Sequence, residues 1–147
     1  FLDTGDMWLV YGYQAAPFVL RINQFEAEMA LGKSLRTRED YYSAVDKFRK
    51  KGISISVISL EGEGAVFANK EKILDVRAPR VSAKTVVGAG DAMMAMLIHA
   101  YKNKWSFEKT ARWSVAAGSA SVMKEGTSIA ELSLIETLLD KISIKII

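Results

Sequence analysis

Residues 85–94, TVVGAGDAMM, place two glycines and one carboxylate directly before an apolar run. Gly88 and Gly90 carry no side chain, so a ligand can approach the backbone closely there. The apolar run predicts a helix whose first N–H groups have no internal acceptor and whose dipole attracts anions. These features predict a phosphate site with the Asp91 carboxylate in the first helical turn. A helix start that Asp91 merely stabilises is the alternative.

Phosphoryl transfer to an alcohol is the chemistry that this combination suits best. Bond formation to the attacking oxygen is late in its loose transition state, so a weak but well-placed base is sufficient. Asp91 is therefore the candidate general base, and the backbone of Gly88, Ala89 and Gly90 is the candidate anion hole. A dinucleotide-binding loop would need a third glycine where Met93 stands, and the Gly-Lys-Ser/Thr run of a Walker A loop is missing. From the loop alone, an anion site and a purely structural turn both remain open.

A sheet and its helices have to position the loop, and the sequence predicts both. Apolar and β-branched runs predict strands at 18–22, 53–60, 65–68, 73–77 and 142–147, with residues 1–3 as a strand tip. Helices are predicted at 5–16, 23–31, 37–51, 90–103, 106–124 and 131–141, with Thr37 and Ser106 as N-caps. This order favours an α/β fold with a mostly parallel sheet flanked by helices and a small antiparallel hairpin at 65–77. The helix after the loop is apolar nearly all round, which predicts that it is buried.

The composition is that of an ordinary globular domain. The 147 residues are 50% hydrophobic and 25% charged, with a net charge of +3. No apolar run reaches the roughly 18 residues that a membrane span needs. The absence of cysteine and the single histidine exclude disulfides and Cys- or His-rich metal sites, and they fit a reducing cytoplasm. The basic cluster at 47–51 is interpreted as the solvated end of a helix, so we expect neither a nucleic-acid nor a membrane partner.

Five stretches together resemble the ribokinase or PfkB family of sugar kinases, in the family's order. VVGAGDAMMA is similar to its D-T-x-G-A-G-D signature, RINQFEAE to its K-P-N-x-x-E motif and SLEGEGAV to its S-L-G-x-x-G-A motif. AAGSASVMKEGT resembles its small-residue helix, and FLDTGD resembles a stretch of the 1-phosphofructokinase and tagatose-6-phosphate kinase branch. The resemblance implies a ribokinase-like fold, of which residues 1–147 are a single nucleotide-binding and catalytic half. The other half, with most of the sugar site and the lid, is expected to be missing.

The resemblance implies transfer of the γ-phosphate of Mg-ATP to a hydroxyl of a sugar or sugar phosphate, with fructose 1-phosphate or a similar compound as the acceptor. Asp91 would take the proton from that hydroxyl, and the backbone of residues 88–90 would hold the transferred group. A strip of six residues would lie against the ATP phosphates: Ser59, Leu60, Glu61, Gly62, Glu63 and Gly64.

Further roles follow from the same resemblance. Asn23 would organise phosphate, Glu26 would reach Mg²⁺ through water, and Val115 would border the adenine. A monovalent cation is a further possibility, and the residues placed for it are Thr85, Ser121, Lys124 and Gly126. Formation of a homodimer by the full-length protein is also left open.

Several of these residues also have a purely structural interpretation. Asn23 and Glu26 fit a helix capping box, and the small residues 116–120 can allow two helices to pack closely. The sequence also departs from the family pattern, with Ile22 in place of proline, Glu61 in place of glycine, Val86 and Val87 in place of hydroxyl-bearing residues and Thr85 in place of aspartate. A carboxylate at position 61 is expected to repel ATP unless it points to solvent.

Two rival functions come from other classes. A nucleotide-binding or regulatory module without kinase activity predicts that ATP binds and no sugar is phosphorylated. A purely structural α/β domain predicts no nucleotide binding. An NAD-binding oxidoreductase fits least, because the third glycine of the fingerprint is missing.

Overall fold

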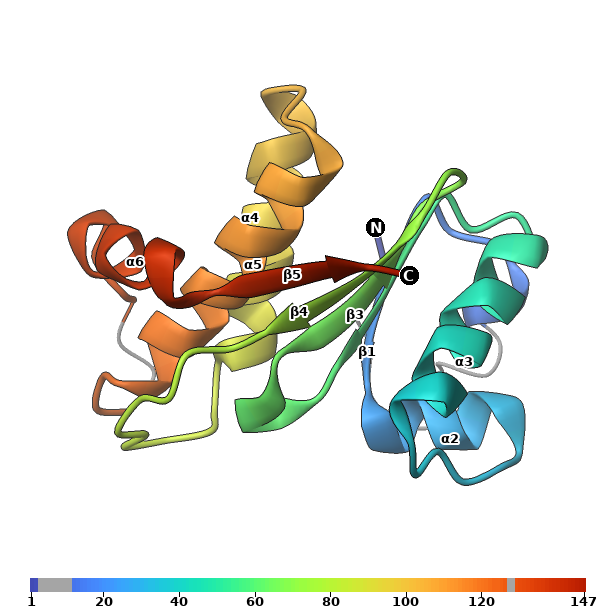
Figure 1. Ribbon diagram of the computed structural model, residues 1–147, viewed down its shortest axis with the longest axis horizontal. Helices are drawn as coiled ribbons and strands as arrows, with labels where there is room; N and C mark the ends of the chain where they lie inside the picture. Colours follow the sequence, from blue (N-terminus) through green and yellow to red (C-terminus); the bar gives the residue numbers. More distant parts are fainter. Residues whose placement is uncertain (3–11, 127–128) are drawn as a thin grey trace. The chain divides into compact units, whose positions relative to one another are not determined.

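The computed structural model describes residues 1–2, 12–126 and 129–147, which form two compact units (Figure 1). The first unit comprises Phe1–Glu61, Ala65–Asp75 and Ile146–Ile147, and the second comprises Gly62–Gly64 and Val76–Lys145. The expectation that the chain is half of a single domain stays a prediction. No helix in the described ranges is both long enough and apolar enough to span a membrane.

The secondary structure follows the predicted α/β order. The strands are β1 (Val19–Asn23), β2 (Ile55–Ser59), β3 (Ala65–Ala68), β4 (Ile73–Arg77) and β5 (Ser143–Ile146). The helices are α2 (Gln24–Leu31), α3 (Arg38–Lys50), α4 (Ala89–Lys102), α5 (Phe107–Val122) and α6 (Leu132–Leu138), with 3₁₀ turns η1 (Glu61–Glu63) and η2 (Leu139–Lys141). The helix predicted at 131–141 therefore tightens into a 3₁₀ turn at its end. The helix predicted at 5–16 lies mostly outside the described residues, and within its range residues 12–14 are helical.

The sheet is mixed, with the strand order β1-β2-β3-β4-β5. β1 and β2 are parallel, with Val19 opposite Ile55 and Asn23 opposite Ser59. β2 and β3 are antiparallel, and β3 is joined to β4 by a short loop closed by the bond from Asn69 N–H to the Lys72 carbonyl (3.1 Å). The hairpin predicted at 65–77 is thereby confirmed. Of the strand tip predicted at residues 1–3, Leu2 forms a parallel bridge to Leu20, and residue 3 lies outside the described residues.

In the first unit, α2 and α3 lie together beside β1, β2 and β3 (Figure 1). The apolar residues of α3 recur on one helical face, which is buried while the charged face is exposed. That face contributes Tyr41, Ala44, Val45 and Phe48 to a core shared with Leu20, Ile22, Ala27, Leu35, Ile53, Ile58 and Val66. Thr37 begins α3 as the predicted N-cap, and Asp40 completes a capping box.

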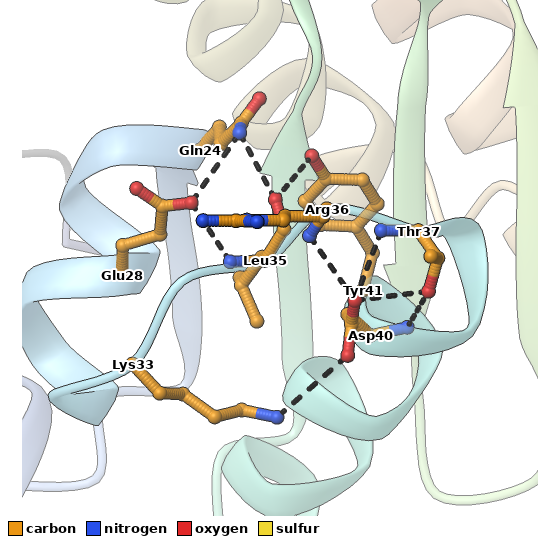
Figure 2. Close-up of polar contacts among 8 residues, drawn as sticks. All are labelled: Gln24, Glu28, Lys33, Leu35, Arg36, Thr37, Asp40 and Tyr41. Carbon is orange, nitrogen blue, oxygen red and sulfur yellow. Dashed lines mark hydrogen bonds and ion pairs between the residues drawn. The ribbon is translucent and has the colours of Figure 1, made fainter.

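The loop between α2 and α3 is held by side chains from both helices, as Figure 2 shows. The carbonyl of buried Leu35 accepts from Gln24 Nε2 and from the Tyr41 hydroxyl, both at 3.1 Å, and its N–H donates to Glu28 Oε1 at 2.8 Å. Asp40 accepts from the N–H groups of the preceding turn, which hold the pKa of its carboxyl below the usual value. The backbone polar groups of a buried loop residue are thus satisfied locally.

A buried carboxylate in β4 joins that strand to α3. Asp75 is 3% exposed, and its two carboxylate oxygens meet Arg38 Nη1 at 3.2 Å and the Tyr42 hydroxyl at 2.7 Å. Burial, followed by the bond to Asp75, raises the pKa of Tyr42 to about 12, so the phenol remains a donor at neutral pH. Because a buried charge without partners is costly, these three side chains act as one unit.

The second unit is built around the pair α4 and α5, which lie side by side (Figure 1). Met93, Met94, Leu97 and Ala100 are buried, but Ile98 is 46% and Tyr101 is 55% exposed. The prediction that this apolar helix is buried is therefore correct for one face and wrong for the other. Within the described residues, packing covers one stripe of α4 and leaves the opposite face to solvent.

Gly64 lies where two backbone segments of the second unit approach closely. It has φ +105°, and a Cβ added there would lie 2.0 Å from the Val76 carbonyl oxygen and 2.7 Å from Ala78 N. No side chain can occupy that space without moving the backbone. A Cβ added two residues earlier, at Gly62, would have no described atom within 4 Å.

We expect Asp75→Asn to lower the free energy of unfolding by about 3–5 kcal/mol, because it breaks a buried charge pair. Urea unfolding of the full-length protein measures this. The control is Lys50→Gln, which removes an exposed ion pair with Asp46 (2.7 Å) and should change the same free energy by less than about 0.5 kcal/mol. Equal effects of the two variants would show that the Asp75 contacts do not stabilise the fold.

Gly64→Ala should lower the free energy of unfolding by more than about 3 kcal/mol, since the new methyl group collides with backbone at a left-handed φ. Gly62→Ala is the matched control and should stay within about 1 kcal/mol of the wild type. Thermal unfolding followed by circular dichroism compares the two. If Gly64→Ala melts with the wild type, the close approach to Val76 does not exist in solution.

Candidate active site

The N-terminus of α4 carries the glycine loop, and its first amides have no acceptor among the described residues. The N-cap is Gly88, with φ 85° and ψ −6°, and no side chain caps the helix. The first hydrogen bond of the helix is donated by Ala92 N–H to the Gly88 carbonyl, at 2.9 Å. The N–H groups of Ala89, Gly90 and Asp91 therefore have no acceptor within the described residues. Their role as an anion hole stays a prediction.

Backbone contacts to the end of α5 fix the segment before the helix. The N–H groups of Lys84 and Thr85 both donate to the Val122 carbonyl, at 2.7 and 3.3 Å. The Thr85 hydroxyl accepts from Val87 N–H at 3.1 Å, and a Cβ added at Gly88 would come within 3.5 Å of Ser121 Oγ. The loop is thus held against α5 while its amides stay unpaired.

The small residues of α5 let it pack directly against the first turns of α4. A Cβ added at Gly118 would lie 2.9 Å from Met93 Cγ and 3.3 Å from the Ala89 carbonyl oxygen. Residues 114–121 are all buried, and Val115 is 3% exposed. Close helix packing therefore explains the small residues, and the role of Val115 beside an adenine remains a prediction.

Asp91 is the third residue of α4 and is exposed to solvent. In the described part of the chain its carboxylate has no ion pair or hydrogen bond. An anionic side chain is favourable at a helix N-terminus, which accounts for the residue type there. The same exposure leaves the carboxylate oxygens able to accept a proton from a bound molecule.

The carboxyl ends of β1 and β2 bring a second set of predicted residues together in the first unit. Asn23 and Ser59 are directly opposite each other in the parallel register. In open α/β sheets, ligands bind beyond the carboxyl ends of parallel strands. Ser59 is 8% exposed; its hydroxyl donates to the Ile22 carbonyl at 3.4 Å and accepts from Arg21 Nη2 at 2.9 Å.

Arg21 is a residue that the sequence analysis missed. It lies in the otherwise apolar strand β1, and its guanidinium reaches Ser59 at the end of the strip predicted for phosphates. The sequence feature that could have indicated it is the arginine within the apolar run FVLRI, because a buried arginine is seldom found without a partner.

The remainder of the strip is a turn rather than a strand. Leu60 is 6% exposed, and the 3₁₀ turn of Glu61, Gly62 and Glu63 that follows is exposed. Glu61 has φ 48°, a left-handed conformation that favours glycine or asparagine. Glu63 lies 3.9 Å from Arg77, and the strip ends at Gly64.

Asn23 and Glu26 form the capping box that was the structural alternative for them. Glu26 N–H donates to Asn23 Oδ1 at 2.9 Å, and Asn23 N–H donates to Glu26 Oε2 at 2.7 Å. Helix capping is sufficient to explain both side chains, and their roles toward phosphate and magnesium stay predictions. No cluster of three acidic or histidine side chains suited to a metal occurs among the residues that the structure describes.

Three of the residues placed for a monovalent cation, Ser121, Lys124 and Gly126, follow one another at the end of α5. Lys124 N–H donates to the Ser121 carbonyl at 3.1 Å, its ammonium lies 3.6 Å from Glu131, and Gly126 has φ 61°. The Thr85 N–H is used by Val122. These contacts neither require nor oppose a bound cation.

Comparisons with known proteins show what the chain as a whole is similar to. The model of the pfkB family carbohydrate kinases matches residues 12–133. The 1-phosphofructokinase of Haemophilus influenzae is 28% identical over 99% of this chain and 47% of its own length. The 1-phosphofructokinase of Escherichia coli K12 is 30% identical over 97% of this chain and 46% of its own length.

A solved structure gives the same result for the fold. Phosphofructokinase-2 from Escherichia coli, in complex with substrates and products, superposes with a TM-score of 0.84 at 25% identity, over 90% of this chain and 43% of that one. The chain thus spans about half the length of the relatives it matches. With the fold, the family model and the relatives in agreement, the chain belongs to the PfkB family of carbohydrate kinases and has a ribokinase-like α/β fold.

Proposed function

We propose that the protein containing this chain is an ATP-dependent carbohydrate kinase. It transfers the γ-phosphate of Mg-ATP to a hydroxyl of a sugar or sugar phosphate, and fructose 1-phosphate is the first acceptor to test because the relatives above are 1-phosphofructokinases. The observation that carries the proposal is the uncapped start of α4 with the exposed carboxylate of Asp91 in its first turn.

The chemistry assigned to this helix start is a proton transfer and a phosphoryl transfer. Asp91 accepts the proton of the acceptor hydroxyl, whose oxygen forms a bond to the γ-phosphorus while the bond to the departing ADP breaks. The N–H groups of Ala89, Gly90 and Asp91 donate to the oxygens of the migrating group. Amides that already point at the developing charge need no reorganisation during the reaction, so they lower the barrier effectively.

In the same proposal the nucleotide phosphates lie along the strip from Ser59 to Gly64. The register of β1 and β2 supports this, because it sets Asn23 beside Ser59 at the carboxyl ends of the strands. Arg21 adds a positive charge at Ser59, and Val115 is assigned to the adenine.

The side chains proposed for this site could hold Mg²⁺ only if the nucleotide phosphates supply most of its ligands. Mg²⁺ is typically held by one or two carboxylates, waters and substrate phosphates. Glu26 provides one carboxylate, of which Oε2 already accepts from Asn23 N–H, so a contact through water is what this side chain could make. When bound, the ion would neutralise phosphate charge. The monovalent cation site and a homodimer of the full-length protein stay predictions.

A nucleotide-binding module without kinase activity is the second candidate. Glu61 favours it, because the strip carries a carboxylate where the family pattern has glycine, and this charge disfavours the placement of ATP for transfer without preventing its binding. The two candidates differ in one outcome: the module binds ATP, and the full-length protein phosphorylates no sugar.

We expect Asp91→Asn in the full-length protein to reduce kcat by at least about 100-fold, since the general base is lost. The Kd for ATP should change less than about twofold, because the amides of the helix start are retained. ADP release coupled to a spectrophotometric assay measures the first quantity, with a panel of sugars and sugar phosphates as acceptors. Isothermal titration calorimetry measures the second.

The control is Asp140→Asn, an exposed aspartate in η2 of the same unit, which should retain wild-type kcat. Normal turnover in Asp91→Asn would remove the base from the mechanism. ATP binding without phosphorylation of any acceptor by the wild type would favour the regulatory module instead.

A further inference from the structure

Glu61 is an uncompensated charge at an open turn. It is exposed, and among the described residues its carboxylate has no ion pair or hydrogen bond, whereas Glu63 in the same turn lies 3.9 Å from Arg77. Beside it, Gly62 has no described atom within 4 Å of an added Cβ, so the turn is open to solvent.

The backbone holds Glu61 in place at a conformational cost. Its φ of 48° lies in the left-handed region, which an L side chain seldom adopts outside Asn and Asp. The residue before it, Leu60, is 6% exposed, and Gly64 after the turn is locked against the Val76 carbonyl. A buried residue on one side and a close backbone contact on the other thus fix the position from which the carboxylate projects. Residues with an unfavourable backbone conformation often occur at functional sites, so the conformation of Glu61 suggests a functional role.

We propose that Glu61 is a specificity-determining residue that makes nucleotide binding depend on the divalent cation. This inference rests on the proposed function, which sets the ATP phosphates along residues 59–64. The carboxylate repels free ATP, while the magnesium complex of ATP carries two fewer negative charges and is repelled less. The site therefore selects metal-bound nucleotide by charge, without a protein ligand to the metal.

Coulomb's law sets the size of the effect. Two unit charges about 6 Å apart in water repel by an amount that weakens binding roughly threefold. Two units of charge therefore separate free from magnesium-bound ATP by about tenfold. Added salt screens an exposed charge, so the discrimination should fall as ionic strength rises.

Calorimetric titration of the full-length protein with ATP tests this, once in excess magnesium and once in EDTA. We expect Glu61→Gln to tighten the binding of free ATP by about tenfold more than that of Mg-ATP, and salt to reduce the difference. Glu61→Gly should give the same ratio, although it also relieves the left-handed backbone. The matched control is Glu71→Gln, an exposed glutamate in the loop between β3 and β4, which should keep the wild-type ratio.

The possible outcomes distinguish the role of Glu61 from the proposed kinase function. A ratio in Glu61→Gln within twofold of the wild type overturns the role of Glu61, even if sugars are phosphorylated. A changed ratio in Glu61→Gly alone assigns the effect to the backbone and also overturns it. Charge-dependent ATP binding without phosphorylation of any sugar supports Glu61 and removes the kinase proposal. Failure of the wild type to bind ATP in either solution removes both.

Discussion

Unpaired backbone N–H groups at the start of α4 are the constraint on which the proposed chemistry depends. Three of the described helices begin with a side-chain cap, supplied by Asn23, Thr37 and Ser106, and the short helix α6 has none. Such a cap typically stabilises a helix by about 1 kcal/mol. α4 begins instead at Gly88 in a left-handed conformation without a side-chain cap. The chain therefore gives up local stability at the one helix start where a phosphate is proposed to supply the missing acceptors.

The surroundings of that helix start compensate through packing. Gly118 lets α5 approach the Ala89 carbonyl and Met93, and the Val122 carbonyl accepts two N–H groups from the preceding loop. Helix–helix contact thus replaces the cap in fixing the position of the first turn. The small residues of α5 thus have a structural reason. Under the proposed function the same packing would also keep the anion hole rigid, so that it needs no reorganisation when charge develops.

In residues 59–64, the strip proposed for the ATP phosphates, the backbone rather than the side chains sets the shape. Its two ends are fixed by burial of Ser59 and Leu60 and by the contact of Gly64 with Val76, and its middle is an exposed turn. Glu61 occupies a conformation that glycine would adopt without strain. The turn is thus determined by its ends, and the residue type at its centre is not dictated by packing.

Local features of this protein could be predicted from its sequence. The caps at Asn23, Thr37 and Ser106, the hairpin at 65–77 and the helix that follows the glycine loop depend on residues within one turn or a few positions of one another. Steric and hydrogen-bonding preferences between residues so close in sequence are the same whatever the rest of the fold. The same is true of the position of Asp91 in the first turn of α4, so the candidate base and its anion hole were visible in ten residues.

Only the tertiary structure decided which distant residues meet. Asp75 lies 33 residues beyond its partner Tyr42, Arg21 reaches Ser59 across 38 residues, and Gly64 is needed because Val76 passes beside it. α4 was expected to be buried all round, yet packing in the described residues covers one stripe of it. Composition reports how apolar a segment is, whereas burial depends on what the fold brings against it. Pairing of a charge, close approach of two backbones and coverage of a face are properties of neighbours in space, and the fold alone supplies those neighbours.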